Sequence, residues 1–112
     1  MAKADRLARL DAHRAEMEND YRDTLIAALR TTAAGKWGLF DHRRDKVARA
    51  AAAPTVARLT EMGEAIDAAR EQLGLPPFDL HAEFLASRGP VGPEAVGEPN
   101  QARAWLDRLT LA

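Results

Sequence analysis

The chain has 112 residues, no cysteine and nearly balanced charges, with 16 basic and 17 acidic side chains. This length predicts a single domain, and the missing thiols exclude disulfides, thiol catalysis and thiolate zinc sites. A net charge of −1 gives no global field toward nucleic acid or an anionic membrane. No apolar run approaches the ~18 residues of a membrane span, and the charged N-terminal sequence is unlike a secretory signal. We therefore expect a cytoplasmic protein.

The residue composition predicts an all-α fold. Alanine, the best helix former, is the commonest residue of the chain, whereas the strand-favouring valine and isoleucine are scarce. No stretch alternates apolar and polar residues for long enough to indicate a strand. We expect a small four- to five-helix bundle with a long N-terminal helix.

The first predicted helix covers residues 4–32, where apolar side chains recur on one face. Gly35 should end it, because glycine readily adopts the left-handed conformation found after helices. A helix of about 29 residues is about 44 Å long, whereas a globule of this size is about 34 Å across. The helix should therefore extend roughly 10 Å past its own domain, and this mismatch is the main sequence indication of a partner.

A turn is predicted over residues 35–41, followed by helices over 42–53 and 55–73. Asp41 is the expected N-cap of the first of these, and Pro54 should separate or kink them. Gly63, near the apolar face, suggests the close approach of another backbone. Gly74 should end the second helix.

The remainder should contain a short helix over 79–87 with Asp79 as N-cap, an irregular loop over 89–99 rich in proline and glycine, and a last helix over about 101–110, capped by Asn100. The expected centre of the core consists of large apolar residues from every predicted helix except 42–53: Leu25, Leu29, Leu59, Ile66, Phe84, Trp105 and Leu109.

The turn holds three large apolar side chains within four positions, Trp37, Leu39 and Phe40. One interpretation is a hydrophobic plug that closes the end of the bundle. The other is an exposed patch that docks on a protein, since tryptophan often anchors such interfaces. With the stripe on the first helix, this second interpretation gives a predicted partner-binding set of Trp37, Leu39, Phe40, Leu7, Leu10 and Met17.

The most cationic region is residues 36–49. A solvated helix face explains it most simply, but arginines near a helix start can also bind phosphates. The candidate phosphate-binding residues, for nucleic acid or an acidic surface, are Lys36, Arg43, Arg44, Lys46 and Arg49.

The three histidines are the candidates for metal or acid–base chemistry. His13 and Glu16 stand three apart, as do His42 and Asp45, but both pairs reverse the Glu-x-x-His order of metal-binding bundles. Caps and exposed ion pairs account for these residues and for the Asp79, His81 and Glu83 group, and nothing in the sequence marks any carboxylate as buried. We therefore expect no metal site, no cofactor and no catalytic residue.

The leading functional hypothesis is a protein-interaction module that forms a homodimer or binds another protein. Two alternatives remain open. One is a nucleic-acid-associated helical protein that uses the basic stretch, and the other is a small metal-binding or enzymatic bundle.

Overall fold

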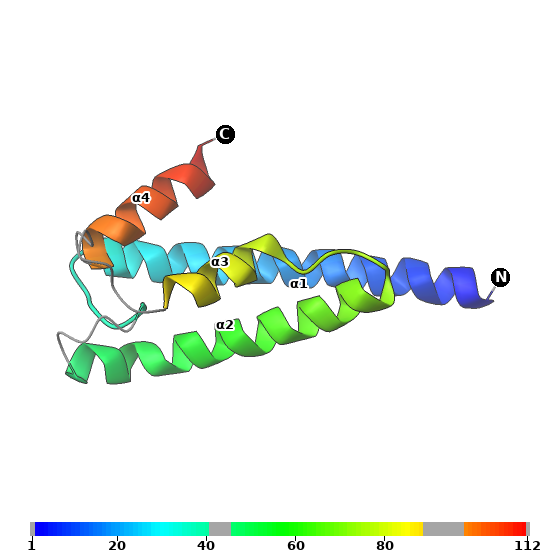
Figure 1. Ribbon diagram of the computed structural model, residues 1–112, viewed down its shortest axis with the longest axis horizontal. Coiled ribbons are helices and arrows are strands. Elements are labelled where there is room, and N and C mark those ends of the chain that lie inside the picture. The colour runs from blue at the N-terminus through cyan, green and yellow to red at the C-terminus, as the bar shows by residue number, and fades with distance from the viewer. Residues whose placement is uncertain (1, 41–45, 89–97, 112) are drawn as a thin grey trace.

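The computed structural model describes residues 2–40, 46–88 and 98–111. These residues form four helices and no strand: α1 (Ala2–Ala33), α2 (Lys46–Gln72), α3 (Asp79–Ser87) and α4 (Glu98–Thr110). The all-α prediction is confirmed. Figure 1 shows successive helices running in alternating directions, with α1 along the length of the molecule. Helix α1 packs mainly against α2 and α4.

The molecule is elongated because of α1. Its 32 residues correspond to about 48 Å of helix, and the molecule measures 54 × 30 × 23 Å along its principal axes. In Figure 1 the N-terminal end of α1 lies beyond the end of α2 and the connection to α3. The long N-terminal helix is confirmed, and it is continuous.

The core is built from one face of each helix. Tyr21, Leu25 and Leu29 of α1 are fully buried and form one cluster with Leu59 and Ile66 of α2, Phe84 of α3 and Trp105 of α4. Leu109, which we predicted at the centre, only packs against this cluster from its edge. The reason is its place near the end of α4, which diverges from α1 (Figure 1).

Pro54 does not separate two helices, contrary to the predicted boundary between 42–53 and 55–73. It lies inside the single helix α2, with its ring exposed to solvent. A proline in a helix interior removes one hydrogen bond and crowds the preceding turn. The long run of strong helix formers around it, Ala50 to Ala53 among them, allows the helix to continue. Asp41 and residues 42–45 lie outside the described residues.

The helix ends follow the predicted glycines but not the predicted caps. Gly35 (φ +108°) follows α1 and Gly74 (φ +72°) follows α2, as expected. Phe78, and not Asp79, occupies the N-cap position of α3. Helix α4 begins at Glu98, before the predicted cap Asn100, because Pro99 is compatible with the first turn of a helix.

Candidate functional site

The N-terminal part of α1, residues 2–13, projects from the body of the molecule, and we call it the α1 tip. Residues 2–9 are all exposed, and Leu10 is half-buried. Leu7 is 41% exposed, which is high for a large apolar side chain. Among the described residues, Glu18 is the most N-terminal side chain of α1 with a hydrogen bond to another helix. In the described part of the chain, hydrogen bonds from α1 to another helix therefore begin only at Glu18, and residues 2–9 of the α1 tip are exposed.

An apolar stripe runs from the α1 tip into the core. Its members follow alternating spacings of three and four residues: Leu7, Leu10, Arg14, Met17 and Tyr21. This is the spacing of helices that pair through a narrow seam. Met17 packs against the core and Tyr21 is fully buried. The stripe that the body covers from Met17 onward thus continues on the α1 tip, where Leu10 is half-buried and Leu7 is exposed.

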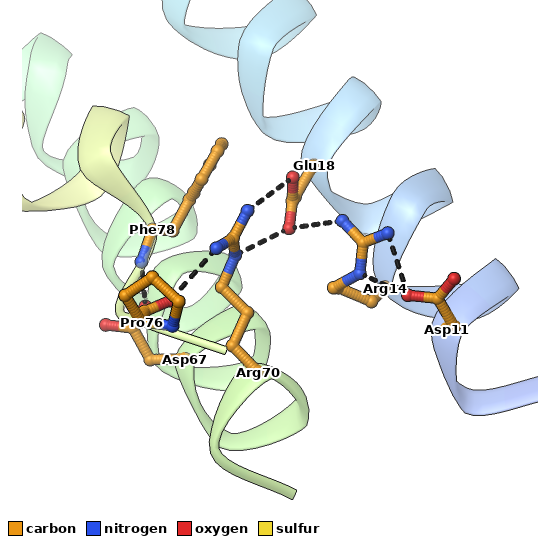
Figure 2. A network of polar contacts seen from close by, with 7 residues as sticks. All are labelled: Asp11, Arg14, Glu18, Asp67, Arg70, Pro76 and Phe78. Atoms are coloured by element: carbon orange, nitrogen blue, oxygen red, sulfur yellow. Dashed lines mark hydrogen bonds and ion pairs between the residues drawn. The ribbon is translucent and has the colours of Figure 1, made fainter. Parts of the chain in front are cut away.

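An ion-pair network marks the point where α1 enters the body (Figure 2). Arg70 of α2 donates to both carboxylate oxygens of Glu18, with Nε at 2.8 Å from Oε2 and Nη2 at 3.2 Å from Oε1. It also donates to the Pro76 carbonyl at 2.9 Å. Arg14 donates to Glu18 at 2.8 Å and to Asp11 at 2.9 Å. The network therefore joins α1, α2 and the connection to α3.

The electrostatics of this network stabilise the charged form of Glu18. Burial alone would raise the pKa of its carboxyl group. The hydrogen bonds and charges of Arg70 and Arg14 outweigh burial, so the pKa lies below its ordinary value of 4.5. Arg14 occupies one position of the otherwise apolar stripe. Its guanidinium pairs with the carboxylates of Asp11 and Glu18.

A second polar contact lies inside the core. The Tyr21 hydroxyl and His81 Nδ1 are 2.9 Å apart, and both residues are buried. The His81 ring packs on Gly63, where a Cβ would overlap the imidazole. Gly63 therefore provides space for a side chain, and not for the backbone that the sequence suggested.

Burial sets the protonation of this pair. It lowers the pKa of His81 from its ordinary 6.5, with the charges of Asp67 and Glu64 opposing the effect. It also raises the pKa of the Tyr21 hydroxyl. The pair is thus a neutral contact that joins α1 to α3. The expectation that His81 belongs to an exposed ion-pair group with Asp79 and Glu83 is wrong.

The apolar turn is part of the core and is not an exposed patch. Leu39 and Phe40 are buried, and Trp37 is half-buried. Phe40 stacks on Trp105 of α4, with ring centroids 6.2 Å apart. Leu39 and Phe40 are therefore not available to a partner, which corrects their place in the predicted binding set. The plug interpretation accounts for their burial.

Gly38, within this turn, has a left-handed backbone at φ +124°. Its N–H donates to a carboxylate oxygen of Glu98 at 2.6 Å. Glu98 is fully buried at the start of α4, although nothing in the sequence marks this carboxylate as buried. The sequence gives little indication that Glu98 is buried. Its one favourable local feature is its position at a helix N-terminus, where a negative charge is stabilised.

Two cavities flank the first half of α2. One, of about 510 Å³, is mostly apolar and is lined by residues from the end of α1, the turn and α2, including Lys36 and Trp37. The other, of about 530 Å³, is lined by Lys46, Arg49 and Arg88 together with Gly38 and small apolar residues of α2. The structure thus separates Lys36 from Lys46 and Arg49, and it adds Arg88, which the sequence did not indicate. Arg43 and Arg44 lie outside the described residues.

Within the described ranges, no group of three or more His, Asp or Glu side chains is placed to hold a metal ion. In the same part of the chain, no helix is both long and apolar enough to cross a membrane.

Comparisons with protein-family models, with curated proteins and with solved structures give no match to this chain. Its function must be argued from its own geometry.

Proposed function

We propose that the protein is a small helical interaction module that associates with a second copy of itself through the α1 tip. The observation that carries the proposal is the continuation of the core stripe onto a projecting helix, where Leu10 is half-buried and Leu7 is exposed. Leu7 and Leu10 lie on this stripe, and Leu7 is among the exposed large apolar residues. An amphipathic helix gains stability mainly by burying such a face.

The geometry favours an antiparallel pair of tips. In a parallel pair, the partner's α1 would continue over the stripe beyond Met17, where the body of the first copy already covers it. In an antiparallel pair, Leu7 of one copy lies opposite Leu10 of the other, and each α1 continues away from the overlap. The body of each copy then stands near the end of the other copy's tip.

We expect this association to be weak. An overlap of about 12 residues spans only about 18 Å, which is short compared with interfaces that bury a standard area of about 1,600 Å². A small interface of this kind supports dissociation constants of about micromolar or weaker. The fraction of chains in the dimer should therefore rise as the protein concentration rises and fall on dilution.

Sedimentation equilibrium from about 10 µM to about 1 mM tests the proposal at the expected affinity. The unmodified chain should pass from monomer to dimer over this range, because the stripe is covered only in the dimer. The double variant Leu7→Glu and Leu10→Glu should remain a monomer at all concentrations, since it places charges on the seam.

A matched control is Leu85→Glu. Leu85 lies in the last part of α3 and is 50% exposed, comparable to Leu7, and that end of α3 is far from the α1 tip (Figure 1). This variant should dimerise like the unmodified chain. A monomer at every concentration, or equal loss of dimer in both variants, contradicts the proposal.

The proposed role is binding and not catalysis. The groups best suited to acid–base chemistry by their burial, His81 and Tyr21, are hydrogen bonded to each other. Glu98 is likewise occupied by the Gly38 amide. These contacts support a structural use of the buried polar groups.

A further inference from the structure

The cavity of about 530 Å³ beside α2 brings together three cationic side chains from separate parts of the sequence. Lys46 lies at the start of α2, Arg49 is one turn further along, and Arg88 follows the end of α3. None of the described residues that line this cavity is acidic. The buried carboxylate of Glu98 accepts from the amide of Gly38, which also lines the cavity.

Arg88 is held in position within the cavity wall. Its Nη1 donates to the Leu39 carbonyl, and its guanidinium lies over the Phe84 ring, 5.9 Å from the centroid. A guanidinium carries five N–H donors, so one bond to a carbonyl leaves donors for an anion. A side chain fixed in this way loses little conformational entropy when it binds.

Close packing of the turn fixes the backbone at Arg49. A Cβ on Gly38 would lie 2.6 Å from the Arg49 Cα, which shows that the turn packs directly on the backbone of α2. Arg49 is half-buried, whereas Lys46 is exposed at the rim. The cavity thus has the Arg88 guanidinium in its wall and the Lys46 ammonium at its opening.

We propose that this cavity binds a phosphate-class oxyanion. Guanidinium groups recognise phosphate oxygens through paired charge-assisted hydrogen bonds, and lysine adds a compact charge. The remaining wall is apolar and small, with Ala50, Ala53, Val56 and Ala57. The volume exceeds that of a single phosphate, so a diphosphate or the phosphate of a small organic ester fits the site. Lys36 is not part of it, because it lines the other cavity.

Calorimetric titration with inorganic phosphate and pyrophosphate, at constant ionic strength, tests this site. The unmodified chain should bind pyrophosphate saturably with one site per chain, and more tightly than phosphate. Lys46→Gln should weaken binding about threefold, as expected for one exposed charge. Arg88→Gln should weaken it more than about tenfold, because it removes a charge-assisted donor.

The controls separate binding from folding and from general charge. Lys36→Gln removes a cation nearby and should bind like the unmodified chain. Arg88→Lys keeps the charge but not the planar donors, so its affinity should lie between those of the unmodified chain and Arg88→Gln. Thermal unfolding of each variant shows whether it is folded. The double variant of Leu7 and Leu10 should bind pyrophosphate normally, since the α1 tip is at the opposite end of the molecule (Figure 1).

A ten-nucleotide oligothymidylate distinguishes the source of the phosphate. Tighter binding than pyrophosphate, lost in Lys46→Gln and steeply reduced by salt, assigns the site to a nucleic-acid backbone. Weaker binding assigns it to a small phosphate. The absence of saturable binding for all three probes overturns the proposal, and so does an equal effect of Lys36→Gln and Lys46→Gln.

Discussion

At the scale of single residues, the contact between Gly63 and His81 determines how closely α2 and α3 approach. In most helix positions, replacing glycine by alanine stabilises a protein by about 1 kcal/mol. Here the new Cβ would overlap the imidazole, and overpacking typically costs about 1–3 kcal/mol. We expect Gly63→Ala to lower the free energy of unfolding by about 2 kcal/mol, measured by urea denaturation.

A double-mutant cycle provides the control for this prediction. In a His81→Ala background the ring is absent, so Gly63→Ala should no longer destabilise and should regain its ordinary helix preference. The two effects are then strongly non-additive, as expected for residues in contact. Additive effects would show that the two residues do not share this space.

The buried Tyr21–His81 pair also predicts a pH dependence of stability. Burial lowers the pKa of His81 below 6.5 in the folded chain, so the unfolded chain binds the proton more readily. Stability should be constant well above this pH and should fall as the pH drops below 6.5, by at most about 1.4 kcal/mol per pH unit. Below about pH 4.5, protonation of Glu18 should add a second loss, because its pKa is lowered by Arg70 and Arg14.

Urea denaturation between pH 8 and pH 5 measures the first of these effects. His81→Gln should be less stable at every pH in this range. Its free energy of unfolding should no longer show the fall with decreasing pH that His81 causes. His13→Gln is the matched control, because His13 is exposed on α1, and it should keep the behaviour of the unmodified chain. A decrease of the same size in His81→Gln would exclude His81 as its source.

Residue-level polar chemistry was the part of the structure least accessible from the sequence. The sequence analysis assigned His81 to solvent because of its acidic neighbours. A usable signal was present in its spacing, since Phe78, His81 and Phe84 lie three apart on one face. Glu98 had no comparable signal. Its burial depends on the Gly38 amide, 60 residues away in the sequence, and a contact at that separation has no local pattern.

At the scale of helices, α2 continues through Pro54 at an energetic cost. A proline in a helix interior costs about 3 kcal/mol relative to alanine, partly compensated because it also restricts the unfolded chain by up to about 1 kcal/mol. Since the ring is exposed, no packing is lost on its removal. We expect Pro54→Ala to raise the free energy of unfolding by about 2 kcal/mol, the difference between these two effects, measured by urea denaturation.

Ala53→Gly is the control for helix propensity at a neighbouring exposed position. It should lower stability by about 1 kcal/mol. If Pro54→Ala destabilises instead, the proline shapes α2 in a way that the rest of the fold requires.

Helix existence followed from local patterns, whereas helix boundaries depended on tertiary structure. Alanine content and apolar periodicity predicted the helices, and Gly35 and Gly74 predicted two of their ends. Of the two predicted effects of Pro54, the separation of two helices did not occur, because a local penalty does not decide a helix that tertiary packing stabilises. The predicted caps Asp79 and Asn100 were wrong because other residues begin those helices: Asp67 accepts from the Phe78 amide at 2.8 Å, and Pro99 extends α4.

At the scale of the whole molecule, the projection of α1 could be predicted from helix length alone. The radius of gyration is 15.8 Å, above the ~13 Å of a compact domain of this size. Helix length alone did not predict which apolar side chains remain exposed. Leu39 and Phe40 are covered by α4 and the core, and only the fold shows this, while Leu7 remains exposed.

Antiparallel pairing of two tips predicts a particular shape in solution. Each molecule is 54 Å long, and an overlap of about 18 Å gives a dimer with a maximum dimension of about 90 Å. Small-angle X-ray scattering over a concentration series should therefore show the maximum dimension growing from that of one chain toward that of the end-to-end dimer as the mass doubles. A dimer that doubles its mass but stays close to the length of one chain would be a side-by-side pair. Such a pair would contradict the antiparallel contact of Leu7 with Leu10, because that contact requires the two bodies to lie at opposite ends of the dimer.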